Sequence, residues 1–298
     1  MDINQKLPSA IAGEFMPDFA AKVRWRMVHD HNPLFPILQD KVAVKRYAHE
    51  RGVATPRMYF VTIDPATLPF DSLPVSCFIK ANHGCGWNIL FESGEFFYFG
   101  QGKGVLDASG KLLPEARHSA IYLSRDQVVE VCRHMLSTRF ETKEWAYQVI
   151  APQIFVEEKL CSADGGELRD YRLFTFNGVV QAIGVGSATF RKNGENVFFT
   201  PDWEPIALTQ YRERLPDPLP ARPAKLNEMI AAAERLGRGI DFARVDLYDS
   251  TQGIMLGEMT LYPESGVPDS PTSCPRFNHW LSNLWQHPAH AAVQWPSV

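Results

Sequence analysis

The sequence lacks any apolar stretch of the roughly 18 residues that a membrane-spanning helix needs. Its first ten residues, "MDINQKLPSA", contain neither the cationic nor the apolar region of a signal peptide. It also has no basic tract, and its formal net charge is −4, so nothing favours binding to the phosphate backbone of nucleic acids. These absences predict a soluble, cytoplasmic protein with no membrane span and no nucleic-acid partner.

Cysteine is scarce, and its spacing is uninformative. The five cysteines are odd in number and form no CxxC pair, so neither a disulfide framework nor a common zinc site is indicated. A reducing cytoplasm is the simplest location for such a chain. With 298 residues, of which 45% are apolar and 21% charged, the chain can form one large domain or two to three lobes. The cysteines are Cys77, Cys85, Cys132, Cys161 and Cys274.

Hydrophobic periodicity predicts an α+β fold dominated by antiparallel sheet, with helices on one side. Ser124 and Gln127 form a capping-box pattern at the start of one helix. Residues 95–123 are predicted to hold a hairpin arm and an irregular insertion. The predicted helices cover residues 41–51, 124–140, 224–239 and 279–290. The predicted strands lie at 58–61, within 75–91 on both sides of a glycine loop, and at 147–160, 168–178, 179–187 and 196–200.

The segment "RVDLYDSTQGIMLGEMTLYPESG", residues 244–266, carries two acids among apolar residues. Its composition predicts a β-hairpin, and the period of two places Arg244, Asp246, Glu258 and Thr260 on one face. Asp246 and Glu258 would lie almost opposite each other, where repulsion at about 4 Å approaches about 4 kcal/mol for an effective dielectric near 20. A cation is therefore expected beside them. It is either Arg244, as a structural salt bridge, or a Mg²⁺ ion held together with nucleotide phosphates.

A second candidate element is the segment "FIKANHGCGWN", residues 78–88, which places Lys80 at a strand end before Gly84 and Gly86. Backbone N–H groups of such a loop can bind phosphate oxygens while the lysine supplies a positive charge. A plain hairpin turn is the alternative interpretation. Three more residues of the loop are either phosphate or metal contacts or structural: His83, Cys85 and Asn88.

Five elements occur in an order that resembles the ATP-grasp superfamily. They are Asp40 with Lys41, the Lys80 loop, "FVEEKL" at 155–160, "RDYRLF" at 169–174, and the acidic hairpin. Together with "EWAYQVIAPQ" and "PDWEPI", they resemble its teichuronopeptide-biosynthesis-like branch, which is associated with bacterial polysaccharide biosynthesis. The resemblance extends over roughly residues 30–268, and its specificity lies in the order of the motifs.

The resemblance implies an ATP-grasp fold, in which two α+β lobes with largely antiparallel sheets hold ATP between them. It divides the chain into a short N-terminal region with the first ATP lysine (1–74), a small lobe (75–156) and a C-terminal lobe with the metal and acceptor site (157–298). The implied cofactors are ATP and Mg²⁺. The residues implied to bind ATP are Lys41, Lys80, His83, Gly84, Gly86, Glu157, Glu158, Lys159 and Leu160.

The same resemblance implies catalytic roles for Lys80, Asp170 and Arg172, the last two from the "DYR" motif. The implied metal ligands are Asp246, Glu258 and Thr260. Thr260 departs from the asparagine that is usual in the family, and the spacing between Pro263 and Gly266 also departs from its pattern.

The activity implied is an ATP-dependent carboxylate–amine ligase that forms an amide through an acyl phosphate and releases ADP and phosphate. Its partners would be ATP and small-molecule or glycan-linked carboxylates and amines, such as polysaccharide precursors or amino-acid-like substrates. Arg191 and Lys192 are further candidate acceptor contacts. The alternatives are a kinase on the same scaffold, which the fewer than forty residues before Asp40 favour, a non-catalytic nucleotide- or glycan-binding module, and a glycosyltransferase.

Overall fold

The computed structural model describes residues 18–98, 105–106, 112–113, 121–139, 143–166, 168–187, 197–206, 219–267 and 275–286. The chain divides into two compact units. Unit 1 consists of Met1–His31, Arg169–Leu247 and Thr260–Val298, and unit 2 of Asn32–Leu168 and Tyr248–Met259. This division differs from the expected boundaries at 74 and 156, because residues 32–74 and 157–168 both belong to unit 2.

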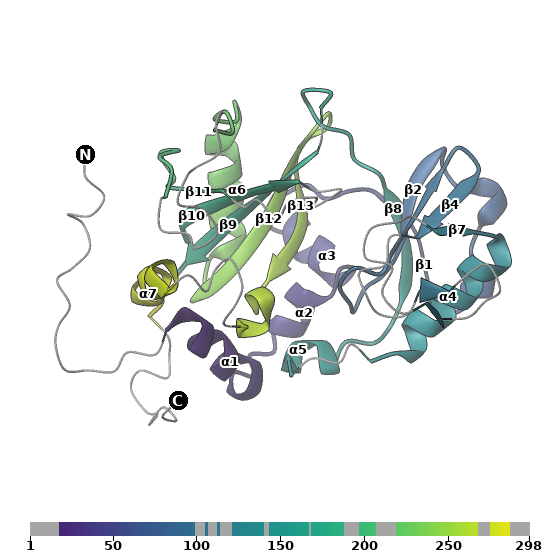
Figure 1. Ribbon diagram of the computed structural model, residues 1–298, viewed down its shortest axis with the longest axis horizontal. Helices are drawn as coiled ribbons and strands as arrows, with labels where there is room; N and C mark the ends of the chain where they lie inside the picture. The colour runs from purple at the N-terminus through teal and green to yellow at the C-terminus, as the bar shows by residue number, and fades with distance from the viewer. Residues whose placement is uncertain are drawn as a thin grey trace. The chain divides into compact units, whose positions relative to one another are not determined.

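Unit 2 contains a six-stranded sheet in the order β1-β8-β2-β3-β4-β7, with antiparallel pairing throughout (Figure 1). Strand β2 alternates between half-buried and buried side chains, as expected for a strand with one face in a core. The strands are β1 Met58–Thr62, β2 Ser76–Ala81, β3 Asn88–Glu92, β4 Glu95–Tyr98, β7 Ile121–Leu123 and β8 Ile154–Glu158.

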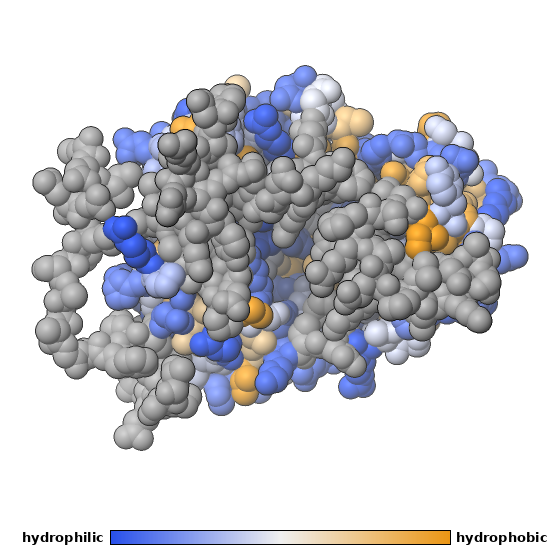
Figure 2. All heavy atoms as spheres, in the orientation of Figure 1, coloured by the Kyte–Doolittle hydropathy of each residue, from blue (hydrophilic) through white to orange (hydrophobic). Residues whose placement is uncertain are grey.

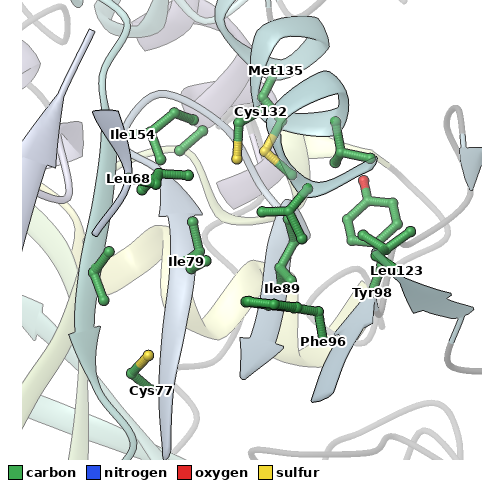
Figure 3. Close-up of a cluster of buried hydrophobic side chains, with 14 residues drawn as sticks. Leu68, Cys77, Ile79, Ile89, Phe96, Tyr98, Leu123, Cys132, Met135 and Ile154 are labelled. Carbon is green, nitrogen blue, oxygen red and sulfur yellow. The ribbon is translucent and has the colours of Figure 1, made fainter. Parts of the chain in front are cut away.

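Helix α4, Arg125–Ser137, covers this core face. The predicted capping box at Ser124 is confirmed, because the Ser124 hydroxyl accepts from Gln127 N and the Gln127 side chain accepts from Ser124 N. Figure 3 shows Cys132 and Met135 of the helix above Ile79 and Ile89 of the strands. Cys132 is thus a core residue, and burial raises its pKa to about 12.

The remaining elements of unit 2 are short. Two lie in the predicted insertion at 95–123, where β5 and β6 pair as a small hairpin, and most of that insertion lies outside the described residues. These elements are α2 Phe35–Gln39, α3 Ala43–His49, α5 Trp145–Gln148, β5 Val105–Leu106, β6 Leu112–Leu113 and the 3₁₀ turns η2 Pro65–Thr67 and η3 Phe70–Ser72.

The second sheet has the order β11-β10-β9-β12-β13, and the last two strands form the predicted hairpin. Helix α6, Leu226–Gly237, packs against β9 and β10. It approaches so closely that a Cβ on Gly237 would lie 2.7 Å from Thr175 Oγ1, which explains the glycine at this helix end. The strands are β9 Arg169–Phe176, β10 Val179–Ser187, β11 Val197–Phe199, β12 Phe242–Ser250 and β13 Gly253–Thr260.

Unit 1 also contains α1, Phe19–His29, which the sequence pattern did not resolve. The helix packs against α7, Pro275–Leu284, and against the turn η4, Pro263–Gly266. Its buried face includes two charged residues. Lys22 Nζ donates to Ser282 O and Trp285 O at 2.7 and 2.8 Å, and Arg26 Nη1 donates to Phe242 O at 2.8 Å.

The described surface is mostly hydrophilic on the face shown in Figure 2, with smaller hydrophobic areas. The large apolar side chains with the greatest exposure are Val75, Ile63 and Tyr122. Within the described part of the chain, no helix is long and apolar enough to cross a membrane.

Candidate functional site

The first predicted ATP lysine lies at the start of α3. Asp40 Oδ1 accepts from Val42 N at 2.8 Å and from Ala43 N at 3.2 Å, so this aspartate satisfies free donors at the helix start. Lys41 follows, and its backbone N donates to Asn82 O at 3.1 Å, while its Nζ donates to Gly84 O at 2.5 Å. Lys41 Nζ also lies 3.9 Å from Glu258 Oε2. The structure therefore brings Lys41, the glycine loop and Glu258 together within unit 2.

The glycine loop after Lys80 is held from inside the unit. Asn82 is fully buried, donates to Ala151 O at 3.0 Å and accepts from Gln153 N at 2.7 Å. A Cβ on Gly84 would lie 2.5 Å from the Trp87 ring, so only glycine fits at this point. Gly86 has a φ of +76°, which also favours glycine. The loop conformation thus depends on both predicted glycines.

His83 is buried, and both ring nitrogens face protein acceptors. Nδ1 lies 3.1 Å from Asn82 Oδ1, and Nε2 lies 3.1 Å from Met135 O and 3.3 Å from Thr138 O. Asn82 Nδ2 donates to Ala151 O, and Asn82 Oδ1 accepts from Gln153 N, which fixes the orientation of the amide. The atom that faces the His83 ring is therefore the acceptor Oδ1. This geometry is that of a structural role for His83, one of the two alternatives that the sequence left open, in which the ring ties the loop to the end of α4.

Lys80 and Lys45 share one carboxylate, that of Glu157 on β8. Lys80 Nζ donates to Glu157 Oε1, and Lys45 Nζ donates to Glu157 Oε2 at 2.9 Å. Burial alone would raise the pKa of Glu157, but the charges and hydrogen bonds of the two lysines outweigh it and hold the pKa at about 2. We call these three residues the Glu157 cluster. With two lysines and one carboxylate, the cluster has an excess of one positive charge.

The rest of the predicted adenine segment also has protein partners. Glu158 Oε1 accepts from Gln252 Nε2, and Lys159 Nζ donates to Glu92 Oε1. Leu160 is buried. Together with Glu157, this segment spans the end of β8 and the residues that directly follow it, as predicted for "FVEEKL".

In unit 1, the "DYR" motif lies at the start of β9, and the period of two places Asp170 and Arg172 on one face. Arg172 Nε and Nη2 both contact Asp170 Oδ2, at 2.7 and 2.6 Å. Each residue is less than 10% exposed. The pair is thus a buried, hydrogen-bonded ion pair.

A second aspartate–arginine pair lies on β12, the strand next to β9. Arg244 Nε donates to Asp246 Oδ1 at 2.7 Å, and Arg244 Nη2 donates to Asp246 Oδ2 at 2.5 Å. The same Nη2 donates to Thr260 Oγ1 at 3.1 Å. The structure thus shows the salt bridge that the sequence left as one alternative, and it brings Asp246 and Thr260 together around one guanidinium.

The chemistry of these oxygen donors fits magnesium. Asp246, Glu258 and Thr260 offer two carboxylates and one hydroxyl, and Mg²⁺ is commonly held by one or two carboxylates together with phosphate oxygens and water. Within the part of the chain that the structure describes, no group of three or more His, Cys, Asp or Glu side chains is arranged to hold a metal.

Lys45 is a site residue that the sequence motifs did not indicate, and Arg244 was expected only as a possible structural partner. Lys45 lies one helical turn after Lys41, which is the signal that could have identified it. The other candidate acceptor contacts, Arg191 and Lys192, lie outside the described residues.

Comparison with known proteins establishes the family. The family described as TupA-like ATPgrasp matches residues 21–283, so the chain belongs to the TupA-like ATP-grasp family, as its motif order predicted. Among curated proteins, none matches this chain by sequence.

The chain is also similar to solved ATP-grasp structures. D-alanine–D-alanine ligase from Bacillus anthracis, complexed with ATP, has 13% identity and a TM-score of 0.43, covering 84% of this chain and 63% of that chain. The ligase PsnB with its minimal precursor has 14% identity and a TM-score of 0.35, covering 77% and 54%. The macrocyclase MdnC from Microcystis aeruginosa MRC, bound with precursor peptide MdnA, has 9% identity and a TM-score of 0.39, covering 89% and 67%. The chain thus spans under two thirds of the length of the first two.

Proposed function

We propose that this protein uses ATP and Mg²⁺ to join a carboxylate to an amine. Membership of the ATP-grasp family supports the use of ATP. The observation that carries the proposal is the arrangement in unit 2, where Lys80 lies on β2 just before the glycine loop and Lys41 Nζ contacts the loop at Gly84 O. Two ammonium groups and the backbone amides of a loop are the groups that bind a polyphosphate.

The Glu157 cluster supports a phosphate-binding role for Lys80. Lys45 donates to Glu157 and to Pro56 O at 2.9 Å each, so it remains bonded to the protein whether or not Lys80 moves. Glu157 therefore keeps a cationic partner when Lys80 turns to a phosphate. The energy needed to release Lys80 is lowered, because no buried carboxylate is left unpaired.

In the proposed reaction, a substrate carboxylate oxygen attacks the γ-phosphorus of ATP and ADP leaves, which gives an acyl phosphate. The nitrogen of an amine then attacks the acyl carbon, the bond from that carbon to the phosphate oxygen breaks, and inorganic phosphate leaves. An amine that arrives as an ammonium ion retains one hydrogen in the amide, and its other two protons go to phosphate and solvent. Lys41 and Lys80 would hold the β- and γ-phosphates, and Arg172 would hold the acyl phosphate.

The remaining predicted roles belong to this proposal. Glu157, Glu158, Lys159 and Leu160 would line the adenine and ribose site. Asp246, Glu258 and Thr260 would hold Mg²⁺, which when bound would neutralise phosphate charge. The proposed acceptors are polysaccharide precursors or amino-acid-like compounds, as the family resemblance implies, and the proposed location is the cytoplasm.

Phosphorus NMR with Mg-ATP and candidate carboxylate and amine pairs tests the reaction. A ligase forms ADP and inorganic phosphate in equal amounts, and only when both acceptors are present. Lys80→Met should weaken nucleotide binding about tenfold or more, since a charged hydrogen bond is worth about 1.5–3 kcal/mol. The matched control is Lys143→Met, because Lys143 is exposed.

Other outcomes would redirect the proposal. A new phosphoester signal in place of inorganic phosphate would show a kinase. Nucleotide binding without turnover on any acceptor pair would indicate a binding module. Equal nucleotide affinity in Lys80→Met and Lys143→Met would contradict the assignment of Lys80.

A further inference from the structure

The tip of the β12–β13 hairpin is bonded to the residues that follow β8. Ser162 and Ser250 form an isolated antiparallel bridge, and Thr251 N donates to Cys161 O at 3.0 Å. All four residues belong to unit 2. The hairpin tip thus holds the chain at Cys161 and Ser162, directly after the segment that is predicted to bind adenine.

Glu158 connects the same hairpin tip to the end of β8. Its Oε1 accepts from Gln252 Nε2, and its Oε2 accepts from Arg57 N at 3.3 Å. Glu158 N also donates to Arg57 O at 2.9 Å. Each carboxylate oxygen therefore has a donor from the protein, and a hydrogen bond to an ionised carboxylate is stronger than one between neutral groups. The Glu158 side chain thus fixes the end of β8.

Lys159 and Leu160 lie between these two fixed points. The pairing of β8 with its neighbours extends to Glu158, and the bonds to the hairpin tip begin at Cys161. The two residues are therefore held from both ends by other parts of unit 2. A small-molecule site fixes the orientation of its ligand through a few well-placed polar groups, among them backbone N–H and C=O groups. The position of this segment therefore matters for the binding of a base.

The turn at the hairpin tip gives Gln252 a fixed position. Gln252 N donates to Ser250 Oγ at 3.2 Å, and Ser250 Oγ donates to Gly253 O at 2.9 Å. Ser250 is 1% exposed, whereas Gln252 is exposed. A side chain that extends from an ordered backbone loses less conformational entropy when it makes a contact. The turn therefore presents the Gln252 amide to Glu158 in a preorganised way, although the side chain lies at the surface.

We propose that Gln252 is a positioning residue for the adenine site. It acts through Glu158, and by this contact it keeps Lys159 and Leu160 in the conformation that binds the base. The inference rests on the proposed function, which assigns the adenine site to the end of β8 and the residues after it. The phosphates are assigned to other groups, the lysines beside the glycine loop. Gln252 therefore contributes to recognition of the base and not to recognition of the phosphates.

Isothermal titration calorimetry with Mg-ATP and with magnesium tripolyphosphate, which has no base, tests the proposal. Gln252→Ala should raise the dissociation constant for Mg-ATP about fivefold, because the segment must then become ordered when the base binds, and should leave that for tripolyphosphate unchanged. Thr251→Ala is the matched control, because Thr251 is exposed in the same turn and its bond to Cys161 uses the backbone. It should leave both dissociation constants unchanged.

An exchange of the two side chains tests whether their contact is responsible. Gln252→Glu places a second carboxylate beside Glu158 and should weaken Mg-ATP binding at least as much as Gln252→Ala. The double variant Glu158→Gln with Gln252→Glu restores an amide–carboxylate pair with the roles reversed, and the amide oxygen introduced at position 158 can still accept from Arg57 N. The double variant should regain the Mg-ATP affinity of the unmodified protein, which a general loss of stability does not predict.

The inference is contradicted if Gln252→Ala and Thr251→Ala bind Mg-ATP alike, or if Gln252→Ala weakens tripolyphosphate binding to the same extent. It is also contradicted if the double variant binds Mg-ATP no better than Gln252→Glu. Equal affinity of the unmodified protein for both ligands would show that the base contributes nothing, which contradicts the role of Gln252 but not phosphate binding. Binding of neither ligand by the unmodified protein contradicts the proposed function, and the inference with it.

Discussion

Glu157 balances part of the positive charge next to the glycine loop. Its carboxylate lies between Lys80 and Lys45, and its side chain is only 10% exposed. Burial of one ion pair would give little net stabilisation, because desolvation offsets attraction. The second lysine changes this balance, because both carboxylate oxygens then have a charged donor.

The depressed pKa of Glu157 predicts a particular dependence of stability on pH. The pKa is about 2 in the folded protein, below the ordinary value of 4.5 for this group, so the folded state binds fewer protons between these values. Stabilisation by Glu157 is therefore complete above about pH 4.5 and is lost as the pH falls towards 2. Relative to Glu157→Gln, the free energy of unfolding of the unmodified protein should fall by up to about 1.4 kcal/mol per pH unit in this window.

Urea unfolding of both proteins at pH 7, 5, 4 and 3.5 measures this difference. Glu50→Gln is the control, because Glu50 pairs with Arg46 at the surface and has an exposed side chain. The difference between Glu50→Gln and the unmodified protein should stay nearly constant over the same range. A constant difference for Glu157→Gln as well would show that its carboxyl titrates normally.

At the scale of elements, the sequence predicted best where local signals and burial agree. The capping box and the apolar stripe of α4 are local features, and both appear in the structure. The hairpin of β12 and β13 was predicted from strand composition around a turn, and Met259 is buried while Thr260 is half-buried, as the predicted faces require. Helix α1 was missed because its buried face carries Lys22 and Arg26, which interrupt the apolar period.

The turn η4 is strained in a way that the sequence could not show. Glu264, Ser265 and Gly266 all have positive φ, and the first two are not glycines. Arg24 Nη1 of α1 donates to Gly266 O at 2.6 Å and holds the turn. This contact joins residues 242 positions apart, so no local pattern could reveal it.

Gly266→Ala should therefore lower the free energy of unfolding by more than the cost of placing alanine in the left-handed conformation. A Cβ at Gly266 would lie 2.7 Å from Ala20 O, whereas Gly239, also in unit 1 and also at positive φ, has open space around it. Both alanine variants should lose about 1–2 kcal/mol for the left-handed conformation. Gly266→Ala should lose at least about 1 kcal/mol more, because its neighbour is backbone and cannot turn aside.

Thermal and urea unfolding of the two variants measure the difference. Gly239→Ala serves as the matched control, because it changes the same conformational term without the steric one. Equal losses in the two variants would show that α1 and η4 can separate without cost, contrary to the contact seen between them.

At the scale of the whole molecule, the chain passes between the two units four times, at residues 31–32, 168–169, 247–248 and 259–260. The order of motifs predicted the family, and the motifs lie in successive elements along the chain, in β2, β8, β9 and the hairpin of β12 and β13. The positions of individual side chains could not be predicted in this way. Lys45 contacts Glu157, which comes from a distant segment, and Thr260 contacts Arg244, which comes from the neighbouring strand. Such contacts depend on the pairing and register of the strands.

Stabilisation by nucleotide tests whether the two groups of site residues act on one ligand. Lys80 belongs to unit 2, and Asp246 to unit 1. A ligand at one hundred times its dissociation constant stabilises the folded state by about 2.7 kcal/mol, so the midpoint of thermal unfolding should rise with added ATP.

If Asp246 acts through Mg²⁺, Asp246→Asn should weaken stabilisation by Mg-ATP but change stabilisation by ATP with a chelator very little. Lys80→Met should weaken both, because the phosphate contact proposed for its ammonium group does not need the metal. Asp71→Asn, at an exposed surface ion pair, is the control for Asp246→Asn. If Asp246→Asn and Asp71→Asn respond alike to Mg-ATP, Asp246 is only the structural partner of Arg244, and the metal must be bound elsewhere.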